Sequence, residues 1–159
     1  MTFFNFLLEY GGIIFATAGI ALVVALPGIG SGKGAGMIGE AAAGLMVEGG
    51  EKFGKSLILQ LMAASQGLYG FVVAIMALGN LNVDMSLQQG MFVFAATLPM
   101  TLVGYFTAIY QSEVARAGIT LLAKNEDEFA KAIIYLIMVE TYALLALVTS
   151  IILLNTVAM

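Results

Sequence analysis

The chain has 159 residues, of which 61% are hydrophobic and 10% charged, with a net charge of −4 and a mean hydropathy of +1.02. Soluble domains carry about 25% charged residues, so this composition indicates an integral membrane protein. The chain has no Cys and no His, which excludes disulfides, zinc sites, Cys nucleophiles and His-based triads, and its acidic balance gives no reason to expect nucleic acid.

Four long apolar segments alternate with three polar breaks along the chain. The segments cover residues 13–29, 57–81, 91–110 and 132–154, and the breaks cover residues 39–55, 79–86 and 124–131. Each segment is long enough for a membrane-spanning helix, and an alternating strand pattern is absent. We therefore predict an all-α membrane protein with four transmembrane helices in a single membrane domain, residues 1–159. The order of the segments predicts two tandem helical hairpins, over residues 11–81 and 87–156.

The six basic residues predict how the hairpins are oriented in the membrane. All of them lie in or beside the first and third breaks: Lys33, Lys52, Lys55, Arg116, Lys124 and Lys131. The positive-inside rule therefore places loops 47–55 and 123–131 in the cytoplasm and both termini outside a multi-pass cell-membrane protein. The residues after Met1 have neither a basic n-region nor a small-residue cleavage site, so we expect the first span to be retained.

The two hairpins look like an internal duplication. A shift of 76 residues aligns Phe53 with Phe129, Lys55 with Lys131, Met62 with Met138 and Ser65 with Thr141. Both copies run in the same direction, unlike the inverted repeats of many secondary transporters. The same shift aligns Glu140 with Ala64, so only the second hairpin carries a carboxylate at this place.

The first segment and the break after it are rich in glycine. Residues 34–39 match the dinucleotide pattern G-x-G-x-x-G literally, but that motif needs a preceding strand, and here it continues an apolar helix. Glycines at 28, 32 and 36 and at 30 and 34 form small-residue ridges, which let helix backbones approach closely. We interpret them as packing positions, suited to the crowded inner side of a ring of helices.

Glu140 is the only charged residue in the apolar segment 132–154. A carboxylate at that depth is costly, and an intramembrane ionisable residue is a functional-site hypothesis by default. At 1.5 Å per residue, Glu140, Gln66 and Gln111 lie roughly 13, 16 and 20 Å from the Lys at the end of their own helix. The three side chains are therefore predicted to share one level.

These residues, with Ser65 beside Gln66, have the chemistry of a cation site. Hard cations take oxygen ligands, and one carboxylate with neutral oxygens balances a monovalent ion. The Met62 carbonyl lies one turn before Gln66 and adds a fifth oxygen if the helix loosens there. Tyr69 shares the face of Gln66 and can donate to the carboxylate. Interhelical hydrogen bonding by Gln and Ser, and a simple proton carrier without cation ligands, are the alternatives.

Four stretches of the chain, taken together, resemble a known family. They are PGIGSGKGAGMIGE (27–40), EKFGKSL (51–57), LQLMAASQGLYGF (59–71) and VETYA (139–143). These stretches are similar to the membrane rotor-ring proteolipids of V-type ATPases, the c or K subunits, and within that family to the bacterial sodium-translocating K subunits. The resemblance covers nearly the whole chain.

The resemblance implies a duplicated helical hairpin, several copies of which form a ring that rotates as ATP is hydrolysed on other subunits. The chain is then not an enzyme itself, and it carries one Na⁺ per copy. The implied Na⁺ ligands are the side chains of Glu140, Gln66, Gln111 and Ser65 and the main-chain carbonyl of Met62. Tyr69 is implied to steady the glutamate.

The partners that the resemblance implies are identical copies in the ring, lipid, a stator subunit that presents an arginine, and central-stalk subunits at the cytoplasmic loops. An H⁺-carrying rotor subunit of the same type and a small proton-coupled secondary carrier stay open as alternatives.

The chain departs from the family at one turn of the second span. The family's Leu-Pro-x-Thr-Gln is replaced by Met62, Ala63, Ala64, Ser65 and Gln66. Because alanine restores the backbone N–H that proline lacks, we expect the proline kink to be absent here. The hydroxyl group is retained by Ser65, so all the ligand atoms are still available.

Overall fold

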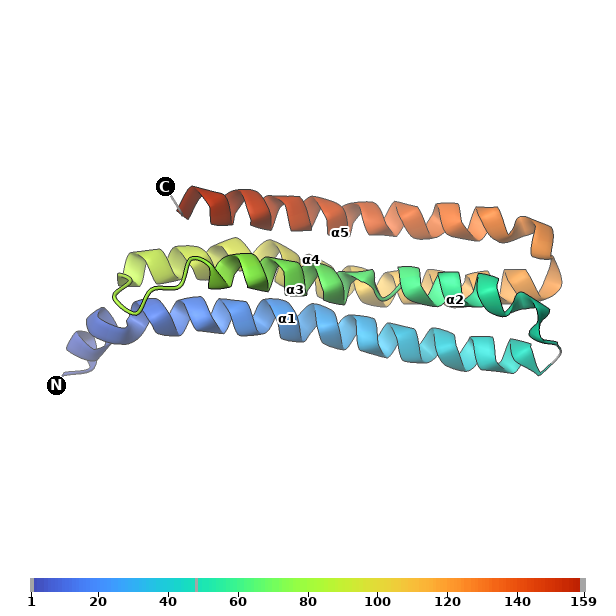
Figure 1. Cartoon of the computed structure of the whole chain (residues 1–159), viewed down its shortest axis with the longest axis horizontal. Helices are drawn as coiled ribbons and strands as arrows, with labels where there is room; N and C mark the ends of the chain where they lie inside the picture. The colour runs from blue at the N-terminus through green and yellow to red at the C-terminus, as the bar shows by residue number, and fades with distance from the viewer. Residues whose placement is uncertain (1, 48, 158–159) are drawn as a thin grey trace.

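The computed structural model describes residues 2–47 and 49–157, and every regular element in these ranges is helical (Figure 1). The α-helices are α1 (Phe3–Met46), α2 (Phe53–Met62), α3 (Ser65–Leu78), α4 (Leu87–Lys124) and α5 (Phe129–Val157). The short 3-10 helices η1 (Gly50–Lys52) and η2 (Glu126–Glu128) precede α2 and α5. The ends of the predicted domain 1–159 and residue 48 of the predicted loop 47–55 lie outside the described residues.

The helices lie side by side along one axis (Figure 1). The start of α1, the end of α5 and the α3–α4 turn lie at one end of the bundle, and the end of α1 and the α4–α5 connection lie at the other. One hairpin is α1 with α2 and α3, the second is α4 with α5, and the most extensive packing between them is that of α1 along α4. The predicted fold class, an all-α protein of two tandem hairpins, is confirmed.

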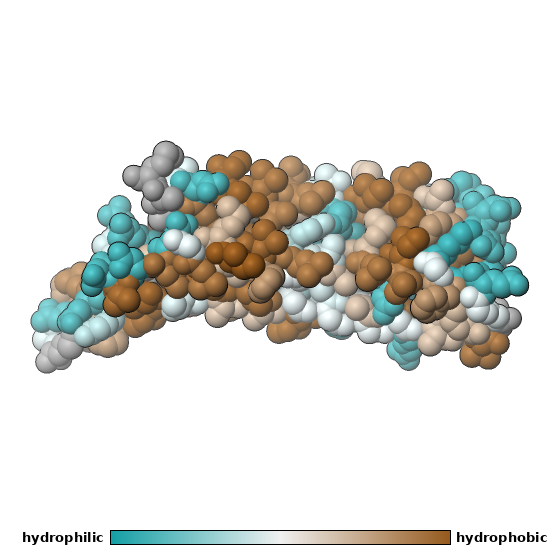
Figure 2. Space-filling view, viewed as in Figure 1, coloured by the Kyte–Doolittle hydropathy of each residue, from teal (hydrophilic) through white to brown (hydrophobic). Residues whose placement is uncertain are grey.

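The hydrophobic surface of the bundle matches a membrane protein. In the described residues, α1, α4 and the η2–α5 stretch are each long and apolar enough to cross a membrane, and α2 with α3 gives a fourth span bent by 41°. Figure 2 shows hydrophobic residues over the middle of the molecule and hydrophilic residues gathered at its two ends. The 44 residues of α1 extend about 66 Å, roughly twice the hydrocarbon thickness, so this helix must project beyond the membrane.

Glycines bring α1 and α4 into backbone contact. A Cβ added at Gly30 would lie 2.9 Å from the Tyr105 carbonyl oxygen, which a real side chain could not tolerate. On the other glycine ridge, a Cβ added at Gly28, Gly32 or Gly36 would have no described atom within 4 Å apart from the adjacent backbone of α1 itself. The predicted glycine ridges therefore lie on two different faces of α1. The face with glycines 30 and 34 packs against α4, and a Cβ added on the face with glycines 28, 32 and 36 would meet no other described element.

The second span is broken, and the straight helix expected from the missing proline was wrong. The first part, α2, ends at Met62, and α3 begins at Ser65 after a 41° bend. The N–H of Gly67 donates to Ser31 Oγ of α1 at 2.8 Å, and not to the Ala63 carbonyl, its partner in a continuous helix. A contact between helices therefore accompanies the bend, which a sequence expectation based on proline alone could not include.

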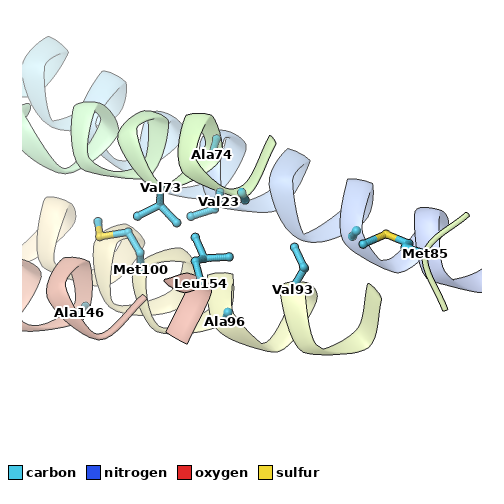
Figure 3. Close-up of a cluster of buried hydrophobic side chains, with 11 residues drawn as sticks. Val23, Val73, Ala74, Met85, Val93, Ala96, Met100, Ala146 and Leu154 are labelled. Carbon is cyan, nitrogen blue, oxygen red and sulfur yellow. The ribbon is translucent and has the colours of Figure 1, made fainter. Parts of the chain in front are cut away.

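Two apolar clusters lie on either side of a layer of polar side chains, which we call the polar layer and which contains Ser65, Gln66, Gln111 and Glu140. Figure 3 shows the cluster nearer the chain ends, where Val23, Val73, Met100 and Leu154 of four different helices meet. The second cluster lies nearer the two interhelical loops and is built from residues 38–45, 59–63, 115–122 and 132–136. The polar layer lies between these stretches along every helix.

Candidate ion-binding site

The Glu140 carboxylate, 9% exposed, is the acidic group of the polar layer. Ser65 Oγ lies 2.9 Å from its Oε1 and 3.0 Å from its Oε2, and Tyr69 donates its hydroxyl to Oε1. Gln111 Nε2 donates to Oε2 at 2.7 Å, with Gln66 Nε2 at 3.4 Å from the same oxygen. Donors from α3 and α4 thus converge on a carboxylate of α5.

The first turn of α3 supplies most of these donors. Ser65, Gln66 and Tyr69 stand at the first, second and fifth positions of the helix, a spacing that puts all three on one side. Because α3 begins at Ser65, the positive end of its helix dipole also lies beside the carboxylate. The bend in the second span therefore places a helix N-terminus beside Glu140 inside the bundle, where it favours a negative charge.

The end of α2 contributes an acceptor to the same place. Met62 is its last residue, and the last four carbonyls of an α-helix have no partner within the helix. The hydroxyl of Ser65 lies 2.9 Å from the Met62 carbonyl oxygen as well as near the carboxylate. Ser65 therefore bridges the two acceptors, and the bend brings a backbone oxygen into the polar layer.

Two fully buried glutamines complete the site. Gln111 Nε2 donates to the Leu136 carbonyl at 3.2 Å as well as to Glu140, and Gln66 Nε2 donates to Gln111 Oε1. Gln66 Oε1 has no hydrogen-bond partner and is the only buried side-chain N or O atom of the described residues in that position. An unsatisfied buried acceptor is costly, about 1–3 kcal/mol. It is therefore the atom of the site that most needs a positive partner.

The oxygens gathered here fit a hard monovalent cation. They comprise one carboxylate, two amide oxygens, one hydroxyl and one backbone carbonyl. Within residues 2–47 and 49–157 no group of three or more His, Cys, Asp or Glu residues could hold a metal ion. A single carboxylate suits one positive charge better than the two of Ca²⁺ or Mg²⁺.

The structure brings together all six residues singled out from the sequence. Glu140, Gln66, Gln111 and Ser65 meet directly, Tyr69 joins them through its hydroxyl, and the Met62 carbonyl is reached through Ser65. Sequence reasoning missed two supporting groups, the Leu136 carbonyl that fixes the Gln111 amide and the Ser31 hydroxyl that receives the Gly67 N–H. Neither has a sequence signal: a backbone carbonyl has none, and Ser31 lies inside the glycine-rich stretch.

Comparisons with known proteins place the site in a family context. The family model for the C subunit of ATP synthase matches residues 18–77 and again residues 94–153. The K subunit of the V-type sodium ATPase of Enterococcus hirae is 49% identical over 142 residues, which is 89% of this chain and 91% of that protein. The K subunit of the A-type ATP synthase of Methanocaldococcus jannaschii is 37% identical over 142 residues, 89% of this chain and 62% of that protein. The human 16 kDa proteolipid of the V-type proton ATPase is 30% identical over 145 residues, 91% of this chain and 93% of that protein.

The two matches of the family model also bear on the internal repeat. The second match begins and ends 76 residues after the first, which is the shift that aligns the two hairpins in the sequence. The predicted resemblance to rotor-ring proteolipids and the predicted duplication are therefore both confirmed.

Proposed function

Because this chain belongs to the family of ATP synthase C subunits, we propose that each copy carries one Na⁺ at Glu140 as a ring of copies turns in the membrane. The chain is a rotor-ring subunit of a V-type rotary ATPase, and hydrolysis of ATP takes place on other subunits of the complex. Identical copies of the chain form the ring, as in the family as a whole.

The observation that carries the Na⁺ proposal is the orphaned Gln66 Oε1. This buried oxygen lacks a donor, and it belongs to the amide whose Nε2 lies 3.4 Å from Glu140 Oε2. Both glutamine Nε2 groups already have partners. Na⁺ supplies a positive partner to this oxygen and to the other oxygens of the site at the same time, whereas the single O–H of a protonated Glu140 can donate to only one acceptor. We therefore expect the ligands to be Glu140, Gln66, Gln111, Ser65 and the Met62 carbonyl.

The charge balance of the site supports a monovalent ion. Glu140 is the only charged residue among the predicted ligands, so an occupied Na⁺ site has no net charge, and a neutral site passes through hydrocarbon at far lower cost than a charged one. The same neutrality lets the site move from the stator into the lipid as the ring turns.

Three hydrogen-bond donors hold the Glu140 carboxylate in a defined place. Ser65, Gln111 and Tyr69 all donate to the carboxylate and keep it facing the glutamine pair. We propose that an arginine of the stator competes with these donors, attracts the carboxylate and releases the ion. The donors then return the carboxylate to its place when the copy leaves the stator.

We also propose the orientation and the remaining partners from the distribution of the basic residues. Loops 47–55 and 123–131 face the cytoplasm, where central-stalk subunits bind them, and both termini face outside. The hairpins 11–81 and 87–156 are then two functional halves, and the second carries the ion-binding glutamate.

An H⁺-carrying rotor subunit is the second candidate, and one observation favours it. Four polar side chains contact the Glu140 carboxyl group, and hydroxyl and amide groups can bind a protonated carboxyl as well as an ionised one. The human relative at 30% identity is a subunit of a proton ATPase. Membership of the family of ATP synthase C subunits argues against the third alternative, a small proton-coupled secondary carrier.

A labelling experiment on the purified ring separates Na⁺ from H⁺. A carbodiimide modifies protonated carboxyl groups, and the modified Glu140 is counted by intact mass. We expect Na⁺ to slow the modification, the half-protecting Na⁺ concentration to rise as the pH falls, and K⁺ at the same concentration to protect far less. Equal rates with and without Na⁺ would overturn the Na⁺ proposal and leave H⁺ as the carried ion.

A further inference from the structure

Ser31 is a buried polar residue that the ion site does not use directly. It lies on α1, is 5% exposed, and its Oγ accepts the N–H of Gly67 at 2.8 Å. Gly67 follows Gln66 in the chain, so this hydrogen bond ends one residue away from a predicted ligand. Ser31 itself makes no hydrogen bond to Glu140 or to either glutamine within the described part of the chain.

The hydrogen bond takes the place of one that would close the bend in the second span. In a continuous helix the Gly67 N–H would bond the Ala63 carbonyl, and here it bonds Ser31 instead. The Ala63 N–H still donates to the Leu59 carbonyl at 3.3 Å. No proline lies between Met62 and Ser65, so the residue types of this stretch do not themselves prevent a continuous helix. The bend therefore depends on a partner outside the span.

The packing around this hydrogen bond allows only a small side chain. A Cβ added at Gly67 would lie 3.2 Å from Ser31 Cβ and 3.4 Å from the Cα of Gly28, so α1 and α3 nearly touch at this level. Ser31 is the only hydroxyl-bearing residue of residues 18–46 of α1. No neighbouring position on this part of the helix can replace its acceptor.

We propose that Ser31 is a positioning residue for the ion site, which keeps the second span bent by holding the Gly67 N–H away from Ala63. The bend is what brings the Met62 carbonyl and the first turn of α3 together at Glu140. Loss of the Ser31 acceptor favours a continuous helix across Ala63 and Ala64, which withdraws the Met62 carbonyl from the site. This inference rests on the proposed Na⁺ function.

The variant that removes the acceptor is Ser31→Ala, tested in the assembled ring by Na⁺ protection of Glu140 against carbodiimide. One buried neutral hydrogen bond predicts a half-protecting Na⁺ concentration about 3- to 10-fold higher than in the wild type. Ser112→Ala is the matched control, because Ser112 is also buried between α1 and α4 but donates only to Ala108 in its own helix. Ser31→Cys, similar in size but a poor acceptor, gives the same measurement if Ser31→Ala prevents assembly.

A second change distinguishes positioning from simple packing. Proline at position 63 cannot continue a helix, because it lacks the N–H and its ring clashes with the preceding turn. The φ of −75° at Ala63 already suits proline. Ala63→Pro also removes the hydrogen bond from the Ala63 N–H to the Leu59 carbonyl, so it is measured alone as the reference. We expect Ser31→Ala combined with Ala63→Pro to regain most of the lost Na⁺ protection and to match Ala63→Pro alone, because proline keeps the bend without Ser31.

The outcomes are separable from those of the proposed function. If Na⁺ does not protect the wild-type ring, the Na⁺ function fails. If Na⁺ protects the wild type and Ser31→Ala equally, the role of Ser31 is overturned while the function stands. If Ser31→Ala is weaker but Ala63→Pro restores nothing, Ser31 acts through packing and the positioning role is likewise overturned.

Discussion

The second spans of the two hairpins occupy matching places in the repeat, but one is a continuous helix and the other is bent. In the second hairpin, α5 runs without interruption through Glu140, whose carboxylate is held by donors from α3 and α4. In the first hairpin, the matching residue is Ala64, and the chain bends between α2 and α3 at that point. One copy of the repeat supplies the charge, and the other lacks the charge and supplies a bend.

The difference shows how a duplicated hairpin can build one site instead of two. The bend exposes a carbonyl at the end of α2 and a helix N-terminus at the start of α3, and neither is possible in a continuous helix such as α5. The amides are also divided unequally, since α1 contains no glutamine, whereas α4 supplies Gln111. The proposed single ion per copy agrees with this division of roles, and each ion would then correspond to two hairpins of the ring.

The difference in role between the two hairpins is tested most directly by moving the carboxylate from one hairpin to the other. Glu140→Gln should abolish ion transport in membrane vesicles, because the neutral amide cannot balance a bound cation. Adding Ala64→Glu to this variant should not restore transport. A glutamate at the bend would have no counterpart of Gln111 on α1.

Two measurements support the interpretation of that experiment. Native mass measurement should show that the ring still assembles in both variants, since Gln fits the space of Glu140. Glu113→Gln, at an exposed carboxylate of α4, serves as the control and should transport as the wild type does. Transport by the double variant would mean that the two hairpins are interchangeable, and the division of roles would be wrong.

The amide side of the site predicts a smaller effect. Gln111→Ala removes a donor to Glu140, a bond to the Leu136 carbonyl and the acceptor for Gln66, all in a fully buried place. Loss of a buried hydrogen bond to a charged group costs about 1.5–3 kcal/mol, so the half-protecting Na⁺ concentration should rise roughly 10- to 100-fold. The measurement is Na⁺ protection of Glu140 against carbodiimide.

Gln60→Ala is the matched control for that prediction. Gln60 also bonds across helices, with Nε2 at 2.9 Å from the Ala35 carbonyl, but it lies outside the polar layer. Its removal should leave the Na⁺ dependence unchanged. An equal loss in both variants would mean that Gln111 serves only to cross-link helices.

Most of the site could be predicted from the sequence because membrane burial makes polar residues conspicuous. Glu140, Gln66 and Gln111 stand out in apolar surroundings, and their distances from the basic loop residues place them at one level. The four spans and the repeat follow from the same contrast between apolar segments and charged loops. The hydrophobic pattern also predicted too little helix, because α1 and α4 continue well past their apolar segments.

The bend of the second span could not be predicted in the same way. Residues 62–65 are good helix formers with no proline or glycine, so local propensity favours a continuous helix. What opposes it is a hydroxyl on another helix, more than 30 residues away in the chain. Such a contact exists only after α1 and α3 have packed, and periodicity along one segment carries no information about it.

The smallest difference between the hairpins lies in their loops, where the matching residues Lys55 and Lys131 pair differently. Lys55 Nζ lies 2.8 Å from Glu126 Oε1 and joins the first hairpin to the second, whereas Lys131 pairs with Glu128 of its own hairpin. The side chains of Lys55 and Glu126 are 40% and 42% exposed, so solvent screens the pair.

Lys55→Gln should lower the unfolding temperature of the ring by no more than about 3 °C, and the effect should disappear in 1 M KCl, where charges are screened within about 3 Å. Lys131→Gln should change less, because its partner is only three residues away and the pair joins no separate elements. Glu126→Gln completes the comparison, since it removes the ion pair but keeps the Lys55 ammonium 5.7 Å from the Phe129 ring. If Lys55→Gln lowers the unfolding temperature as much in 1 M KCl as at low salt, the contact with Phe129 rather than the ion pair joins the loops.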